Sequence, residues 1–235
     1  MPLLSVIVPV YNNEDNIYDL YLEIKDALKD SIESSEIVLV NDGSRDGSTR
    51  LLNELAQSDQ TLKVIHFDKS YGKTAAIWAG IKNSDGELIA LMDAELQSDP
   101  KDLIKMMSFI RNNDFVNGRR EKWQDSIAIK WTSRMESRFF SWVTGYRIED
   151  TGCPLKLFKR EVADSFYLFN GMHCFLPILT KVNGFSVIEV SVKQRQRKQG
   201  KPQYSVWRQA GAGIINAIVV GWFHKRVIRY RIKEG

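Results

Sequence analysis

The first hundred residues alternate between short apolar runs and longer amphipathic stretches. Each apolar run has the length of a buried strand. The runs are residues 3–10, 36–40, 63–67 and 87–92. Between the runs, apolar side chains recur at helical spacing, and such alternation predicts an α/β fold with a doubly wound, mostly parallel sheet flanked by helices.

The second half of the chain is less regular. Residues 116–120 predict a short strand that ends in two arginines, and the alternation over 184–192 predicts another strand. An amphipathic helix is expected over 127–143 and a shorter helix at about 177–183.

Four loops follow the four predicted strands. They are residues 9–14, 41–48, 68–73 and 93–99. Right-handed crossovers place every such loop on the same edge of a parallel sheet, where ligands bind in this class of fold. We therefore expect these loops to line one crevice.

The fourth loop is acidic. Asp93 and Glu95 come directly after a buried strand, and hard cations such as Mg²⁺ and Mn²⁺ prefer oxygen ligands and bridge carboxylates to phosphates. The alternative is an acidic loop that only caps the next helix at Asp99 and Pro100.

The second loop, residues 41–48, contains two glycines and Asp42, which we expect to be exposed. Such a loop suits hydrogen bonding to a nucleobase or to ribose hydroxyls, and the alternative is a plain turn. The chain contains neither a Walker A loop nor a Gly-x-Gly-x-x-Gly motif, which disfavours a nucleoside triphosphatase and a dinucleotide dehydrogenase.

Charge is unevenly distributed along the chain. Residues 193–235 contain eleven Lys or Arg and one acidic residue, whereas the preceding part is net negative. A short apolar stretch at 210–223, followed by basic residues, predicts an interfacial helix on an anionic membrane, and the alternative is a core-packed helix with a solvated tail. A nucleic-acid binder is disfavoured because the basic residues are interleaved with this apolar stretch and no nucleic-acid motif is present.

Five spaced motifs make the chain resemble glycosyltransferase family two, the inverting nucleotide-sugar transferases of GT-A fold. Within that family the chain looks like the branch of polyprenyl-phosphate glycosyltransferases of the dolichyl-phosphate mannose synthase type. The motifs are Val8-Pro9-Val10-Tyr11-Asn12 with Glu14, Val40-Asn41-Asp42-Gly43-Ser44, Gly72-Lys73, Asp93-Ala94-Glu95-Leu96-Gln97 and Asp150-Thr151-Gly152-Cys153. Two departures concern the metal and the acceptor: Glu95 stands where Asp is usual, and Cys174 where Arg is frequent.

The resemblance implies roles for particular residues. The nucleotide would be bound by Pro9, Tyr11, Asn12, Glu14, Asp42, Gly72, Lys73, Asp93 and Gln97. A Mg²⁺ or Mn²⁺ ion would be held by Asp93 and Glu95, and the catalytic group would be Asp150, Asp93, Arg119 and Arg197. For Arg119 the alternative is a solvated surface charge.

Asp150 has two possible roles. It is the general base if the acceptor is a hydroxyl group, and it only orients sugar or acceptor if the acceptor is a phosphate that is already ionised.

The sequence therefore predicts a metal-dependent glycosyltransferase at the cytoplasmic face of the membrane, bound peripherally. The enzyme would move a sugar from a UDP- or GDP-sugar to a polyprenyl phosphate. A soluble enzyme that glycosylates a sugar hydroxyl is the alternative, followed by a non-catalytic nucleotide-sugar sensor. Residues 1–204 would form the catalytic domain, with 1–100 binding nucleotide and 101–204 the acceptor, and residues 205–235 the membrane-interface helix and tail.

Overall fold

A computed structural model describes most of the chain. The described residues are 3–29, 32, 34–121, 138, 142–143, 145–195, 218–222 and 226. Arg197 lies outside them, as do most of the helix expected over 127–143 and most of the segment 205–235.

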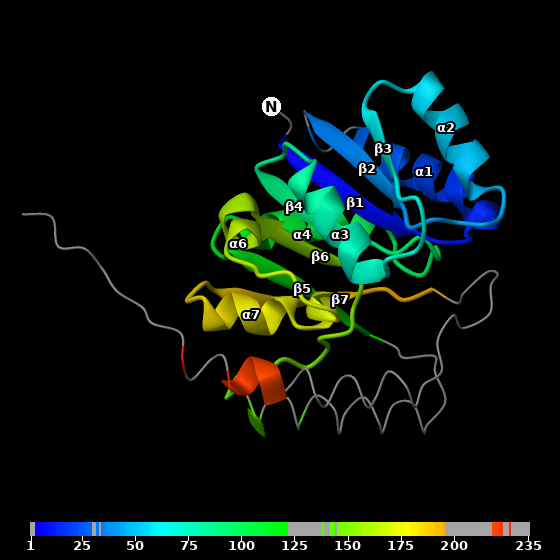
Figure 1. Ribbon diagram of the computed structural model, residues 1–235. Helices are drawn as coiled ribbons and strands as arrows, with labels where there is room; N and C mark the ends of the chain where they lie inside the picture. The colour runs from blue at the N-terminus through cyan, green and yellow to red at the C-terminus, as the bar shows by residue number, and fades with distance from the viewer. Residues whose placement is uncertain are drawn as a thin grey trace, which may run out of the picture.

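A seven-stranded sheet forms the centre of the molecule (Figure 1). Its order is β3-β2-β1-β4-β6-β5-β7. The strands are β1 (Leu4–Val10), β2 (Ser35–Asn41), β3 (Leu62–His66), β4 (Leu88–Leu91), β5 (Phe115–Arg120), β6 (Lys156–Lys159) and β7 (Val187–Val192). All neighbours pair in parallel except β6, which is antiparallel to both β4 and β5. The predicted mostly parallel sheet is therefore confirmed.

Helices cover both faces of the sheet. They are α1 (Glu14–Lys29), α2 (Ser48–Ser58), α3 (Lys73–Lys82), α4 (Lys101–Ile110), α6 (Arg160–Asp164), α7 (Leu176–Val182) and the short 3-10 helix η1 (Met172–Cys174). One core layer holds buried side chains of α1, α2 and α4, and the other holds those of α3, α6 and α7. The alternation of β1 separates the layers, because Val6 and Val8 face the first and Ile7 faces the second.

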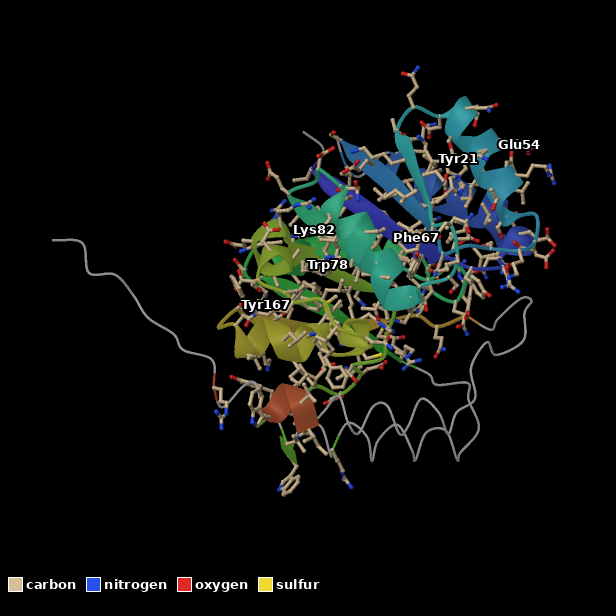
Figure 2. All side chains as sticks on the ribbon, viewed as in Figure 1. Tyr21, Glu54, Phe67, Trp78, Lys82 and Tyr167 are labelled. Atoms are coloured by element: carbon tan, nitrogen blue, oxygen red, sulfur yellow. The ribbon has the colours of Figure 1, made fainter. Side chains whose placement is uncertain are left out.

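Helix α3 lies very close to β1. A Cβ atom on Gly80 would come within 2.4 Å of the Ile7 side chain, so only glycine permits this approach. On the same helix, the Lys82 ammonium lies 4.9 Å from the ring centroid of Trp78 (Figure 2).

Strand β6 was not predicted from the sequence. Its four residues are too few for an alternation to stand out, and lysines occupy both of its ends. Because β6 runs antiparallel, its first residue, Lys156, pairs with Leu91 at the carboxyl end of β4. The strand thus places a lysine at the edge of the sheet where ligands are expected.

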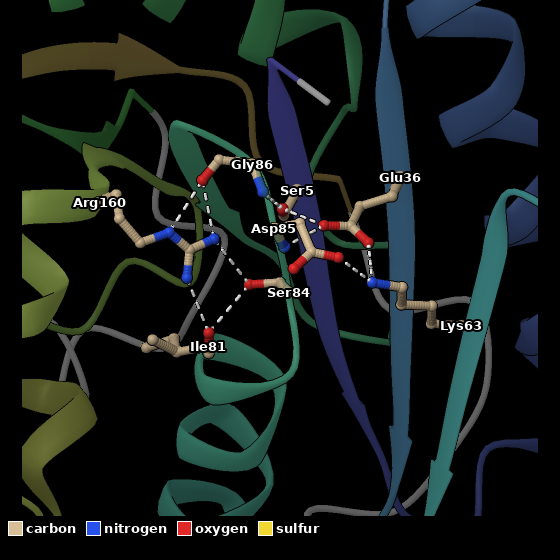
Figure 3. A network of polar contacts seen from close by, with 8 residues as sticks. All are labelled: Ser5, Glu36, Lys63, Ile81, Ser84, Asp85, Gly86 and Arg160. Carbon is tan, nitrogen blue, oxygen red and sulfur yellow. Dashed lines mark hydrogen bonds and ion pairs between the residues drawn. The ribbon is translucent and has the colours of Figure 1, made fainter. Parts of the chain in front are cut away.

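The opposite, amino edge of the sheet is closed by a polar network (Figure 3). Glu36 accepts hydrogen bonds from the Ser5 hydroxyl and the Asp85 amide, and it forms an ion pair with Lys63. Arg160 donates to the carbonyl groups of Ile81 and Gly86. These bonds fasten the turn between α3 and β4.

Candidate active site

The loops after β1, β2 and β3 enclose a pocket of about 250 Å³ at the carboxyl edge of the sheet. The lining residues are Tyr11, Asn41, Gly43, Ser44, Arg45, Thr49, His66, Phe67, Asp68, Lys69 and Ser70. Tyr11 is the residue in this lining that was predicted to contact the nucleotide. Pro9 instead lies within β1, paired with Val40.

Side chains of the first loop hold the second loop in place. The Asn12 side-chain oxygen accepts a hydrogen bond from the Arg45 backbone amide at 2.8 Å, and the backbone amide of Asn12 donates to the Ser44 hydroxyl. Glu14 accepts a bond from the Gly47 amide at 2.6 Å. Asn12 also has a positive φ of 51°, a strained conformation that is enriched at functional sites. Both predicted residues therefore shape the wall of the pocket.

Asp42 is buried, and the expectation that it is exposed was wrong. Its side chain is 3% exposed, and its carboxylate accepts bonds from the amides of Tyr71 and Gly72 and from the Ser70 hydroxyl, all between 2.7 and 3.1 Å. The sequence did not reveal this because the donors lie about thirty residues further along the chain. Gly72 reaches these bonds at a φ of +92°, which residues with side chains rarely adopt.

A second set of polar side chains forms the floor of the pocket. Asn41 donates to Thr49 and lies 3.0 Å from Nδ1 of His66, whose Nε2 lies 3.0 Å from the side-chain oxygen of Asn53. An amide oxygen only accepts hydrogen bonds, so Nε2 of His66 carries the proton and Nδ1 accepts from Asn41. This chain of bonds joins β2, β3 and α2.

The acidic loop after β4 presents alternate residues to solvent. Asp93, Glu95 and Gln97 are half-buried, while Ala94 and Leu96 between them are buried. Leu96 has a positive φ of 56°, and with Asn12 it is one of the two non-glycine residues in the described chain with such a backbone. Strain of this kind concentrates at ligand sites.

Lys73 forms an ion pair with Asp93. Its Nζ lies 2.5 Å from Oδ1 of the carboxylate, at the first residue of α3. Burial lowers the pKa of Lys73, but Asp93, Cys174 and Glu95 outweigh that effect and raise it. Lys73 was predicted to bind nucleotide, and the structure joins it to the predicted metal ligand.

The donor set after β4 fits a hard cation. Asp93 and Glu95 supply carboxylate oxygens, and the Lys73 ammonium shows that this position already holds a positive charge. The described residues contain no group of three or more His, Cys, Asp or Glu side chains that could hold a metal. Remaining ligands would therefore come from substrate phosphate and water, as is usual for Mg²⁺.

His173 lies beside this ion pair. Its Nδ1 is 2.8 Å from the Thr74 hydroxyl, which also accepts a bond from the Gly171 amide. Burial and the neighbouring Lys73 ammonium lower the pKa of His173 to about 3. The imidazole is therefore neutral at pH 7.

Asp150 is held by Arg120 and not by a solvent-facing partner. Two guanidinium nitrogens of Arg120 each donate to the carboxylate at 2.8 Å, and the Arg120 amide donates at 3.2 Å. The Asp150 side chain is 3% exposed. The sequence singled out Arg119 and missed Arg120, because a strand end gives no sign of which neighbour turns inward.

Arg119 lies on the partly exposed side of β5. It pairs with Glu149 at 3.0 Å and donates to the Ser191 hydroxyl at 3.2 Å. Both charged side chains of that pair are nearly half exposed, so the described contacts match the surface alternative. A catalytic role for Arg119 stays a prediction.

Lys156 was missed by the sequence analysis. It is buried and donates to the backbone carbonyl groups of Thr151 and Cys153. Burial, opposed by Cys153 and Asp150, lowers the pKa of Lys156. The sequence feature that could have indicated a buried lysine is its position inside the apolar run at 155–158.

The segment after β7 crosses the acidic loop. Arg195 pairs with Glu23 of α1 at 2.5 Å and with Asp99 at 2.9 Å, and its amide donates to the Gln97 carbonyl. These bonds join the two halves of the molecule. The predicted catalytic Arg197 is two residues further along the chain and lies outside the described residues.

The comparison with protein families decides the class. The family described as glycosyl transferase family 2 matches residues 5–167, which include the pocket loops, Asp93 and Asp150. The chain belongs to this family. The resemblance drawn from the five motifs is thereby confirmed.

Curated relatives carry the name of a lipid-phosphate sugar transferase. The undecaprenyl-phosphate 4-deoxy-4-formamido-L-arabinose transferase of Proteus mirabilis is 32% identical over 204 residues, which are 86% of this chain and 63% of the relative. The Pseudomonas aeruginosa (strain LESB58) protein of the same name is 34% identical over 210 residues, which are 88% of this chain and 61% of the relative. The chain thus spans about three fifths of the length of these relatives.

Solved structures confirm the GT-A fold. Glucosyl-3-phosphoglycerate synthase of Mycobacterium tuberculosis, in complex with Mn²⁺, UDP-glucose and phosphoglyceric acid, aligns with a TM-score of 0.70 at 15% identity, over 93% of this chain and 80% of its own. A mannosyltransferase of Pyrobaculum calidifontis, in complex with GDP-mannose and Mn²⁺, aligns with a TM-score of 0.66 at 20% identity, over 95% of this chain and 64% of its own.

Proposed function

We propose that the protein transfers a sugar from a UDP- or GDP-sugar to a polyprenyl phosphate at the cytoplasmic face of the membrane. The observation that carries the proposal is the position of Asp93 and Glu95 directly after β4, at the same sheet edge as the pocket built by the loops after β1, β2 and β3. Residues 1–100 would hold the donor and residues 101–204 the acceptor.

The donor half has the parts that a nucleotide sugar needs. The pocket offers Tyr11 and the backbone of the second loop to a nucleoside, and Asp42 fixes the third loop against it. Asp93 and Glu95, with Gln97 beside them, would hold Mg²⁺ or Mn²⁺, which when bound neutralises charge on the diphosphate leaving group. Lys73 adds a cation at the start of α3.

The environment of Asp150 favours a phosphate acceptor. A general base must have a carboxylate free to take a proton, and this one is buried against Arg120 with three hydrogen bonds from that residue. A phosphate monoester, whose second pKa is about 6, is already ionised near pH 7 and needs no base. In this proposal Asp150 positions the acceptor-side loop.

An exposed apolar surface supports contact with a membrane. Ile218, Val219 and Trp222 are each more than half exposed on the helical segment 218–222, whose buried Val220 joins the core. Trp142 is 82% exposed, and its neighbour Val143 packs against Gly221. None of the described helices is long and apolar enough to cross a membrane. We propose that this surface lies in the interface of an anionic leaflet.

Liposome binding tests the membrane contact. Replacing Trp222 or Trp142 with Ser should weaken sedimentation with anionic liposomes about fivefold each, because each change removes part of a tryptophan's apolar area from the interface. Tyr18→Ser is the matched control, since Tyr18 on α1 is about as exposed as Trp222 and lies away from this surface. Equal weakening by all three changes would contradict the proposal.

Transfer from a panel of labelled UDP- and GDP-sugars to polyprenyl phosphate in detergent tests the reaction itself. We expect a chloroform-soluble product that disappears with EDTA and with Asp93→Asn. Transfer to a soluble sugar, with no lipid product from any donor, would contradict the proposal and favour the hydroxyl-acceptor alternative.

A further inference from the structure

Lys73 forms an ion pair with Asp93, the carboxylate that would bind the metal ion in the proposed function. Its ammonium lies 2.5 Å from Oδ1 of Asp93, and Glu95 adds a favourable electrostatic interaction. The positive charge therefore lies near both carboxylates predicted to bind the metal.

A divalent ion and this ammonium cannot use Asp93 in the same way at once. Mg²⁺ requires carboxylate oxygens at about 2.0–2.1 Å and near-ideal octahedral geometry. An ammonium already on one of those oxygens would stand a few ångströms from the ion, where like charges repel strongly in a partly buried site. Binding of the metal to Asp93 therefore favours opening of the ion pair.

The Lys73 side chain can change conformation without disturbing the fold. It is the first residue of α3, its side chain is about one third exposed, and a lysine side chain has a flexible four-carbon stem. The helix itself is fixed independently, since Gly72 donates to Asp42 and Thr74 contacts His173. The side chain can therefore leave Asp93 while the backbone stays in place.

We propose that Lys73 is a positioning residue that holds the Asp93 carboxylate in the metal-free protein. Its ammonium is displaced from Asp93 when a metal ion and a nucleoside diphosphate bind. The diphosphate offers the released ammonium a new anionic partner, so each ligand makes binding of the other easier. The inference rests on the proposed metal role of Asp93. It adds a coupling between metal binding and diphosphate binding that the metal site alone does not require.

Binding of Mn²⁺ to the full chain, followed by the electron paramagnetic resonance signal of free Mn²⁺, tests the inference without any turnover. We expect Lys73→Met to bind Mn²⁺ alone about fivefold more tightly than the unmodified protein, since the competing charge is gone. UDP should strengthen Mn²⁺ binding to the unmodified protein and have a smaller effect on the variant. Lys73→Arg keeps the charge and should behave like the unmodified protein.

Two controls separate the possible failures. Lys82→Met removes a charge from the other end of α3 and should leave Mn²⁺ affinity unchanged. Asp93→Asn should abolish Mn²⁺ binding in both the Lys73 and the Lys73→Met background. If it does not, the proposed metal role of Asp93 fails. If it does, but Lys73→Met binds Mn²⁺ no more tightly or less tightly, the metal role stands and the displacement of Lys73 is wrong.

Discussion

Arg120 and Asp150 form a two-pronged ion pair, with Nε and Nη2 each 2.8 Å from a carboxylate oxygen. The pair connects β5 to the loop that precedes β6. Breaking a buried pair leaves the remaining charge without compensation, which is far more costly than losing an exposed pair. The ion pair thus anchors the loop that precedes β6.

Asp150→Asn should therefore destabilise the protein. We expect the free energy of unfolding to fall by about 2–4 kcal/mol, because the Arg120 guanidinium loses its charged partner. Urea denaturation measures this change. Arg119→Gln, which removes the neighbouring exposed pair with Glu149, is the control and should cost less than about 1 kcal/mol. A loss of activity in Asp150→Asn at unchanged stability, with a lost acid limb of the pH-rate profile, would instead show a general base.

Asp42→Asn should weaken nucleotide binding. The amide can accept from fewer of the three donors that now hold the third loop, so we expect UDP or GDP affinity to fall about tenfold or more. Isothermal titration calorimetry measures the affinity. Asp26→Asn, at an exposed position on α1, should leave it unchanged. Unchanged affinity in Asp42→Asn would show that the buried carboxylate does not shape the pocket.

His173 should make stability depend on pH between 7 and 5. Its pKa of about 3 in the folded protein lies below the ordinary 6.5, so its contribution is fully present above pH 6.5 and is lost as the pH falls toward 3. Between pH 7 and 5 the unfolding free energy should fall by about 1–2 kcal/mol more in the unmodified protein than in His173→Gln. Parallel pH profiles of the two proteins would contradict the burial of a neutral imidazole.

Glu36 should make the free energy of unfolding depend on pH in a more acidic range than His173 does. Burial raises the pKa of Glu36, but hydrogen bonds from Asp85, Ser5 and Lys63 outweigh burial and hold it below the ordinary 4.5. A lowered pKa stabilises the fold above about pH 4.5, and this contribution disappears as the pH falls through the folded value. Glu36→Gln should cost about 1–3 kcal/mol at pH 7 and progressively less below pH 4. A cost that stays constant down to pH 3 would contradict the network in Figure 3.

The part of the chain proposed to bind the nucleotide, residues 1–100, was predictable from sequence because each of its strands is a buried apolar run. Parallel pairing then fixed which loops share an edge, and the structure places three of the four predicted loops around one pocket, whose lining contains no residue of the fourth loop, 93–99. Pairings between distant residues were not predictable. Lys73 meets Asp93, and Asp42 meets Gly72, only after β2, β4 and α3 are assembled.

The part of the chain proposed to bind the acceptor was less predictable for a related reason. The short strand β6 depends on its neighbours β4 and β5 and not on its own pattern. The pairing of Arg120 with Asp150, and the burial of Lys156, follow from that strand's position. Sequence patterns record burial on one element and do not record which partner a buried charge acquires.

A comparison of two acceptors tests the central claim most directly. The unmodified protein, a single active nucleotide sugar and Mn²⁺ would be supplied with either polyprenyl phosphate or the polyprenyl alcohol of the same chain length. Since Asp150 is committed to Arg120, we expect glycosylated lipid from the phosphate and less than about one hundredth of that rate from the alcohol. Comparable rates from the two lipids would contradict the account and show that the protein activates a hydroxyl group.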